Sequence, residues 1–197
     1  MESGRRRILV AAATALVLLP VFLALWYAAA GPLAWIPGKL ALPVIRIASG
    51  GTTVMALKAR ELVYTVKLEM PYRPGGVPRI AAEVEVAAGK YTYGIALFLA
   101  LALAAKDSRR PVGIAIGAAI LVALPAFGIA FDALKQLGAT RGMAPFLSWG
   151  AAMREAIALG YQAGTLLLPT LAPVAIWLVL GRDAWLPPAF AGGRSAT

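Results

Sequence analysis

The side chains that most often perform nucleophilic and acid–base chemistry are scarce in this chain. It contains no cysteine and no histidine, which excludes thiol nucleophiles, disulfides, imidazole bases and the usual zinc ligands. A serine nucleophile would need a lysine as its base, and Ser49, Ser108 and Ser148 show no spacing to a lysine that indicates such a pair. We therefore expect no catalytic residue, no metal ligand, no bound cofactor and no enzymatic activity.

Two other patterns could suggest chemistry, and each has a simpler interpretation. Glu83 and Glu85 occupy alternate positions of a predicted strand, so they share one face of it. A solvated strand face explains them better than an acid–base pair or a metal site. Gly75 and Gly76 lie in a proline-rich loop rather than at the start of a helix, which argues against a phosphate cradle.

Small residues recur every four positions in two apolar segments. They are Gly113 and Gly117 in the first segment, and Ala156, Gly160 and Gly164 in the second. This spacing lets the backbones of two helices approach closely where lipid supplies no hydrophobic drive. Packing between the two segments is the simpler interpretation, and an interface with a partner protein is the alternative.

Polar residues gather around the same region of the chain. The candidates for a polar interface are Asp132, Arg154, Glu155, Tyr161 and Gln162. Polar groups near the membrane are costly unless they are paired. A hydrogen-bonded cluster at the level of the headgroups is the simpler interpretation, and a recognition patch for the transmembrane segment of a partner is the alternative.

The composition defines the setting in which these residues work. Of 197 residues, 60% are hydrophobic and 14% are charged, with a mean hydropathy of +0.77, whereas soluble domains are about 45–50% apolar and about 25% charged. The chain is therefore predicted to be an integral membrane protein in contact with lipid. Its net charge of +10 does not indicate a nucleic-acid partner, because many of the basic residues flank apolar runs as topology determinants do.

The first apolar run, residues 8–30, follows Arg5–Arg7 and contains no charge. Small residues at 28–31 would suit cleavage of a signal peptide. However, the run is longer than the roughly 7–15 apolar residues of a signal peptide. Trp26 and Tyr27 near its far end suit the interfacial belt of a retained helix. We expect an uncleaved first transmembrane helix.

Three more apolar runs, at residues 91–105, 111–131 and 156–180, predict further transmembrane helices. The run at 91–105 is short, since its helix would cover only about 23 Å of a hydrocarbon layer about 30 Å thick. It spans if the helix starts near Ala87 and Lys90 reaches outward. That arrangement also places the basic clusters in the cytoplasm.

Prolines and polar residues shape the last two of these runs. Pro125 is expected to kink the helix at 111–131, and Pro169 and Pro173 are expected to bend the helix at 156–180. The intervening residues 132–155 are predicted to form a polar loop with amphipathic character. Its apolar residues could lie along the headgroup boundary: Leu134, Leu137, Phe146, Leu147 and Trp149.

The segment between the first two predicted helices, residues 31–90, has a different pattern. Residues 64–70 and 80–86 alternate between apolar and polar side chains, which is typical of half-buried strands. Residues 71–79, rich in proline and glycine, predict a hairpin loop between them. A third strand is expected at 52–59, and the resulting small antiparallel sheet would rest on the bilayer or on a partner.

These elements predict a membrane all-α bundle of four transmembrane helices with a small antiparallel β extracytoplasmic insertion between helices 1 and 2. Residues 1–30 would hold the cytoplasmic tail and the first helix. Residues 31–90 would form the extracytoplasmic strand-rich loop, and residues 91–197 would hold helices 2–4 and a second cytoplasmic tail.

The order of these segments resembles the family of membrane proteins associated with exosortase H. The resemblance is carried by the arginine-led first helix, the strand-rich loop, "YTYGIALFLALALA" at 91–104, "FDALKQL" at 131–137, "REAIALGYQAGTLLLPTLAPVAIW" at 154–177 and the short tail. It implies a bacterial inner-membrane protein that accompanies a transpeptidase-like sorting enzyme. It supplies no catalytic residue for this chain.

Three functions remain open at this point. The resemblance favours a non-catalytic accessory protein of a protein-sorting system, which docks an exosortase-like enzyme or an exported substrate. A small membrane subunit of a transporter or of an envelope-polymer export complex is the alternative. A membrane enzyme is the least favoured, because no catalytic set of residues is evident.

Overall fold

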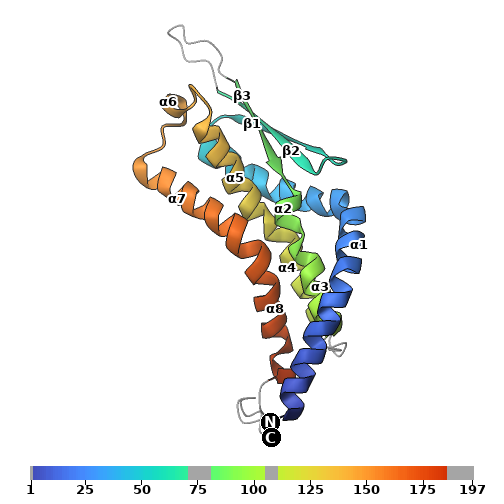
Figure 1. Ribbon diagram of the computed structural model, residues 1–197. Coiled ribbons are helices and arrows are strands. Elements are labelled where there is room, and N and C mark those ends of the chain that lie inside the picture. The colour runs from blue at the N-terminus through green and yellow to red at the C-terminus, as the bar shows by residue number, and fades with distance from the viewer. Residues whose placement is uncertain (1, 71–80, 105–110, 186–197) are drawn as a thin grey trace, which may run out of the picture.

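A computed structural model describes residues 2–70, 81–104 and 111–185 of the chain. The described residues are mostly helical, and a small sheet lies at one end of a helical bundle (Figure 1). The predicted hairpin loop with Gly75–Gly76, Ser108 and the C-terminal tail lie outside the described residues.

Three helical stretches are long and apolar enough to cross a membrane. They are Ala12–Ser49, Pro111–Ala139 and Ala151–Leu180. The prediction of an integral membrane protein is therefore supported by length and composition. The predicted second helix falls in a shorter apolar stretch, Gly89–Ala104, and its full passage through the membrane stays a prediction.

This shorter stretch contains α2 (Gly89–Thr92) and α3 (Gly94–Ala104). Every second residue of α3 from Gly94 to Ala104 is buried. Helix α3 packs against α1 (Glu2–Ser49), α4 (Pro111–Ala123) and α8 (Leu168–Trp185). It is thus enclosed by the three longer helices.

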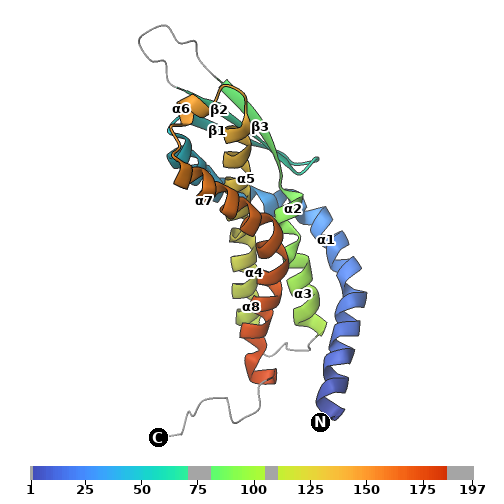
Figure 2. The same cartoon turned by 60° about the vertical axis from the view of Figure 1, so that its left-hand side comes forward.

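The helices run alternately up and down the bundle (Figures 1 and 2). Helix α1 begins at the end far from the sheet, and α3 runs back to that end. Helices α4 and α5 (Pro125–Ala139) return towards the sheet. Helix α7 (Ala151–Gln162) then leads through a π-helical segment, η1 (Ala163–Leu167), into α8, which ends far from the sheet.

The first helix is longer than predicted, which corrects the boundary placed at residue 30. Helix α1 continues to Ser49, so residues 31–49 are helical and do not belong to the strand-rich loop. Figure 1 shows that α1 bends and that its C-terminal part runs alongside the sheet. That part contains Pro32, Pro37 and Pro43, which lack the backbone N–H and favour bends.

Packing explains why this proline-rich part of α1 stays helical. Ala34, Ala41 and Ile45 are fully buried and belong to the same core cluster as the buried residues of the sheet. They are spaced by seven and four positions, which places them on one buried face of the helix. Burial against the sheet and α5 therefore maintains a helix that the local sequence does not indicate.

The predicted polar loop at 132–155 is also wrong over much of its length. Residues 132–139 form the second half of α5, residues 144–147 form α6 (Ala144–Leu147), and α7 begins at Ala151. Ile129, Ala133 and Leu137 are fully buried on one face of α5, so this half of the helix is amphipathic and is held by the sheet.

The two expected irregularities lie close to their predicted positions. Helix α4 ends and α5 begins around Leu124, with Pro125 at the start of α5. The long C-terminal helix is irregular at η1, which ends just before Pro169, and Pro173 lies inside α8. In a π-helical segment the hydrogen bonds join residues five apart rather than four, and this local change can bend the helix.

The three-stranded antiparallel sheet is confirmed. Its order is β1 (Thr52–Lys58), β2 (Val63–Glu69) and β3 (Ala81–Ala87). The register pairs Val66 with Val84 and Leu68 with Ala82, and all four side chains are buried. This apolar face packs on α1 and α5, and the opposite face carries the charged residues.

Candidate functional site

A hydrogen-bonded cluster around Asp132 lies at the sheet end of the bundle. One carboxylate oxygen, Oδ2, accepts from Lys90 Nζ at 2.9 Å and from the Tyr91 hydroxyl at 2.8 Å. The other, Oδ1, accepts from Gln136 Nε2 at 3.1 Å. Asp132 is only 3% exposed, and a buried carboxylate requires such partners.

Four elements contribute to this cluster. Asp132 and Gln136 lie one turn apart on α5, and Lys90 and Tyr91 lie on α2. Gln136 also donates to the backbone carbonyl of Glu85 in β3 at 2.8 Å. The Tyr91 hydroxyl lies 3.4 Å from the Thr165 hydroxyl in η1. The cluster therefore connects the sheet, α2, α5 and the π-helical segment.

Next to this cluster, the helices of the bundle pack backbone against backbone at several glycines. A Cβ atom added at Gly164 would lie 2.6 Å from Gly128 Cα, and one added at Gly94 would lie 2.9 Å from the Pro169 carbonyl oxygen. A Cβ at Gly128 would collide with the ring of Tyr91. Glycine is required at these positions because α3, α5, η1 and α8 approach one another so closely.

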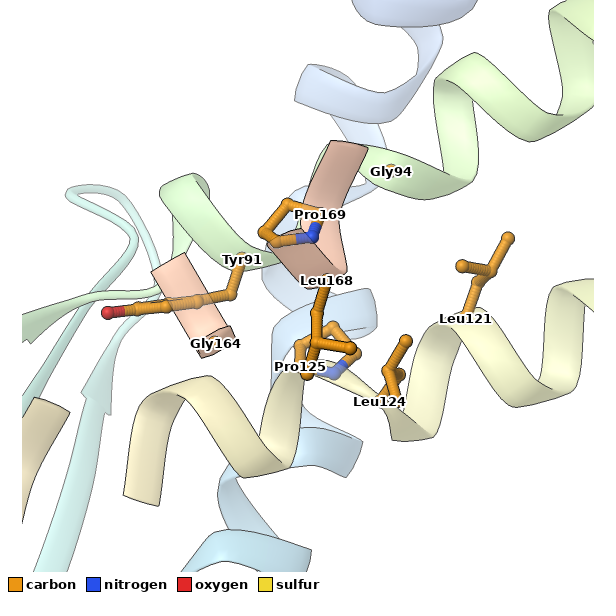
Figure 3. A pocket seen from close by; sticks show the side chains of 8 residues that line it. All are labelled: Tyr91, Gly94, Leu121, Leu124, Pro125, Gly164, Leu168 and Pro169. Atoms are coloured by element: carbon orange, nitrogen blue, oxygen red, sulfur yellow. The ribbon is translucent and has the colours of Figure 1, made fainter. Parts of the chain in front are cut away.

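A small cavity of about 10 Å³ remains at this junction, between Tyr91, Leu121, Leu124 and Leu168 (Figure 3). The Tyr91 hydroxyl points away from Leu121 and Leu124, and mainly apolar side chains surround the space. A cavity needs about 10–15 Å³ to hold one water molecule. The space is therefore a packing gap and has no room for a substrate or a cofactor.

The predicted polar interface residues do not form one cluster. Asp132 faces α2 and is buried, whereas Arg154, Glu155 and Gln162 are exposed on α7. Tyr161 is half-buried, and its ring lies under the Lys135 ammonium group, 3.6 Å from the ring centroid. The structure thus separates Asp132 from the exposed polar face of α7.

The predicted small residues lie at different kinds of positions. A Cβ at Gly117 would lie 2.5 Å from Phe98 Cζ, and one at Gly160 would collide with Phe131. Gly164 meets Gly128 as described above. Gly113 is half-buried, and Ala156 is exposed. Within this chain, Gly117, Gly160 and Gly164 therefore pack against the chain's own helices.

The remaining candidate residues take up structural positions. Glu83 and Glu85 are exposed on the outer face of the sheet, where they pair with Lys67 at 3.2 Å and Lys58 at 2.9 Å. Among the residues that the structure describes, no group of three or more acidic, cysteine or histidine side chains could hold a metal ion.

Two of the candidate serines are described. Ser49 is buried, and its hydroxyl lies 3.3 Å from the Thr53 hydroxyl. Ser148 is exposed and has a left-handed backbone, with φ of 50°. Neither has a lysine among the hydrogen-bond partners found in the described chain.

Sequence reasoning identified Asp132 but not its partners. Lys90 was expected to reach outward from the short second helix, and no partner within the chain was predicted for it or for Tyr91. Both bind a carboxylate 41 or 42 positions away in the sequence. The isolated charge of Lys90 at the start of an apolar run was the available signal, because such a charge usually has a partner.

Long apolar helices, an enclosed short helix and a small sheet at one end of the bundle define a multi-pass helical membrane protein. Residues 5–184 match the family model described as exosortase H-associated membrane protein. The chain therefore belongs to this family, which confirms the resemblance carried by its sequence. No curated protein and no solved structure matches it.

Proposed function

We propose that this chain is a non-catalytic accessory protein of an exosortase-type sorting system, and that it docks the sorting enzyme or an exported substrate. Membership of the exosortase H-associated family is the observation that carries this proposal. The composition agrees with it, because a chain without cysteine cannot supply the thiol nucleophile of a sortase-type enzyme.

Co-purification from the native membrane tests this role. A tagged chain, extracted in mild detergent, should retain an exosortase-like enzyme or a protein that is being sorted. Recovery of an ATPase or a large transporter in its place would support the alternative, a small subunit of an export complex. Turnover of a sorting substrate by the purified chain alone would contradict a non-catalytic role.

The proposed membrane arrangement has four crossings in the inner membrane, with both termini in the cytoplasm and the sheet on the exported side. The alternating directions of α1, α3, α4–α5 and α7–α8 support an even number of crossings (Figure 1). The stretch Gly89–Ala104 would be about 24 Å long as a helix, so a modest local thinning of the bilayer would allow it to span.

The distribution of basic residues supports the same orientation. Arg5–Arg7 precede the apolar part of α1, and the segment between α3 and α4 contains Lys106, Arg109 and Arg110. Helix α1 begins, α3 ends and α4 begins at the end of the bundle that is far from the sheet (Figure 1). Short basic segments favour the cytoplasm, so the sheet would face outward.

Reporter fusions test the orientation independently of the partner. A periplasm-active enzyme fused after Met70 should be active, and the same enzyme fused after Ser108 should be inactive. A fluorescent protein that matures only in the cytoplasm should give the reverse pattern. Equal readouts at the two positions would contradict a spanning α3 and the exported placement of the sheet.

A further inference from the structure

A groove of about 240 Å³ lies between α5 and α7 at the sheet end of the bundle. Its apolar lining includes the buried residues Leu147 and Ile157 and the half-buried Trp149. Lys135 on α5 and Arg154 on α7 also line the groove, so each of its two walls contributes one basic side chain. The groove thus combines an apolar floor with two positive charges at its rim.

The floor of the groove is fixed by specific contacts. The indole Nε1 of Trp149 donates to the Ala48 carbonyl at the end of α1, at 2.7 Å. The ring also packs on Gly138, where an added Cβ would lie 2.8 Å from Trp149 Cζ3. Both contacts fix the position of the indole ring. The floor of the groove is therefore already formed in the absence of a ligand.

The two basic side chains are available to an anion. In the part of the chain that the structure describes, neither Lys135 nor Arg154 belongs to an ion pair. Both are exposed. The Lys135 ammonium group is held over the ring of Tyr161, a contact that positions the charge without neutralising it.

The lengths of the helical stretches that form its walls place the groove at the level of lipid headgroups. The apolar stretches that carry its walls, Pro111–Ala139 and Ala151–Leu180, contain 29 and 30 residues. Each would extend about 44 Å as a helix, which exceeds a hydrocarbon layer of about 30 Å. Lys135 and Arg154 are near the sheet-side ends of these stretches, so they lie beyond the hydrocarbon on that side.

We propose that this groove binds an anionic phospholipid, with its phosphate between Lys135 and Arg154 and its apolar part on the floor of Trp149, Leu147 and Ile157. Lysine and arginine are the side chains that bind phosphate most strongly, and the bilayer supplies the lipid at high local concentration. The lipid would wedge α7 against α5. This inference does not depend on the proposed accessory function.

Lipid binding to the purified chain tests the proposal. In detergent micelles, titration followed by native mass spectrometry should show one phosphatidylglycerol held more tightly than phosphatidylcholine. The double variant Lys135→Gln/Arg154→Gln should bind phosphatidylglycerol roughly 10- to 30-fold more weakly. Ala158→Trp, which fills the groove and keeps both charges, should also lose the lipid.

A matched variant separates the groove from general surface charge. Lys39→Gln/Arg60→Gln removes the same charge from exposed positions that do not line the groove, and Lys39 also lies over an aromatic ring, that of Trp35. This control should bind phosphatidylglycerol as the unaltered chain does. Equal affinities for all variants would overturn the proposal, as would binding of inorganic phosphate or of a peptide carboxylate in place of the lipid.

The unaltered chain provides a second measurement if the variants fold poorly. A photoactivatable phosphatidylglycerol should label the peptides of α5 and α7 that border the groove. Labelling spread evenly over the lipid-exposed faces of α4 and α8 would show annular lipid only and would contradict a specific site.

Discussion

The Lys90 ammonium nitrogen lies 2.9 Å from Oδ2 of Asp132 and so links α2 to α5 with an ion pair. The two ends of this pair have different surroundings, because the Lys90 side chain is 40% exposed and that of Asp132 only 4%. If the pair is broken, water can therefore solvate the lysine ammonium group, whereas the buried carboxylate depends on its hydrogen bonds to the protein. Loss of the pair should therefore cost more free energy at Asp132 than at Lys90.

Replacement of Asp132 by alanine should destabilise the fold. Asp132→Ala removes the acceptor of Lys90, Tyr91 and Gln136, and the buried Tyr91 hydroxyl loses its strongest partner. We expect the free energy of unfolding to fall by roughly 2 kcal/mol, measured by denaturant titration in micelles. Asp132→Asn, which keeps an acceptor, should cost less, and equal stability of all three chains would contradict the role of this cluster.

Gly160 and Ala156 provide a matched test of helix packing. Gly160→Leu would drive a side chain into Phe131, so we expect a loss of about 1–3 kcal/mol from overpacking. Ala156→Leu places the same side chain at an exposed position one turn away and should leave the unfolding midpoint unchanged. If Ala156→Leu instead abolished co-purification of a partner with no loss of stability, the exposed face of α7 would be a partner interface.

Stability should decrease in alkaline solution because of Tyr64. Its hydroxyl donates to the Ala34 carbonyl of α1, and burial raises its pKa above the ordinary value of 10.0. The unfolded chain therefore loses this proton at a lower pH than the folded chain. The contribution of Tyr64 is fully present below about pH 10 and is lost as the pH rises further.

The comparison of Tyr64→Phe with the unaltered chain measures this effect. The variant should be less stable at neutral pH because the hydrogen bond is missing, and the part of the alkaline decline due to this group should disappear. Tyr27→Phe, at an exposed position of α1, should keep the alkaline decline. An identical pH dependence for the Tyr64→Phe variant and the unaltered chain would assign the decline to other groups.

The carboxylates on the outer face of the sheet should contribute little. Glu83 and Glu85 pair with lysines, but all four side chains are at least half exposed, and such pairs are weakened by water and salt. We expect Glu83→Gln/Glu85→Gln to keep the unfolding midpoint of the unaltered chain. A large loss of stability, or the loss of a bound divalent cation detected by calorimetry, would indicate a site that the geometry does not suggest.

The sheet and the apolar helices were largely predictable from the sequence. Alternation along β2 and β3 identified the face that contains Val66 and Val84, because a side chain in a strand points to the same face at every second residue. Residues 111–131 and 156–180 were recognised as apolar helical runs by their length and lack of charge. These patterns are local, so they can be recognised without knowing which other segments of the chain pack against them.

The second half of α1 and the second half of α5 were missed for a common reason. Residues 31–49 contain prolines, and residues 132–139 contain polar side chains, so each stretch locally resembles a loop. Both are helical because one stripe of each packs on the sheet. That stabilisation comes from residues distant in sequence, which local propensity does not report.

The sequence by itself determined that this is a membrane protein, which segments are apolar enough for lipid, and that no thiol or imidazole is available for catalysis. Those conclusions depend only on composition and on local periodicity. Only the tertiary structure decided that Asp132 pairs with Lys90 and Tyr91, and that Lys135 and Arg154 face one groove. Such pairs join residues tens of positions apart, and their distances are set by how the helices bend and pack.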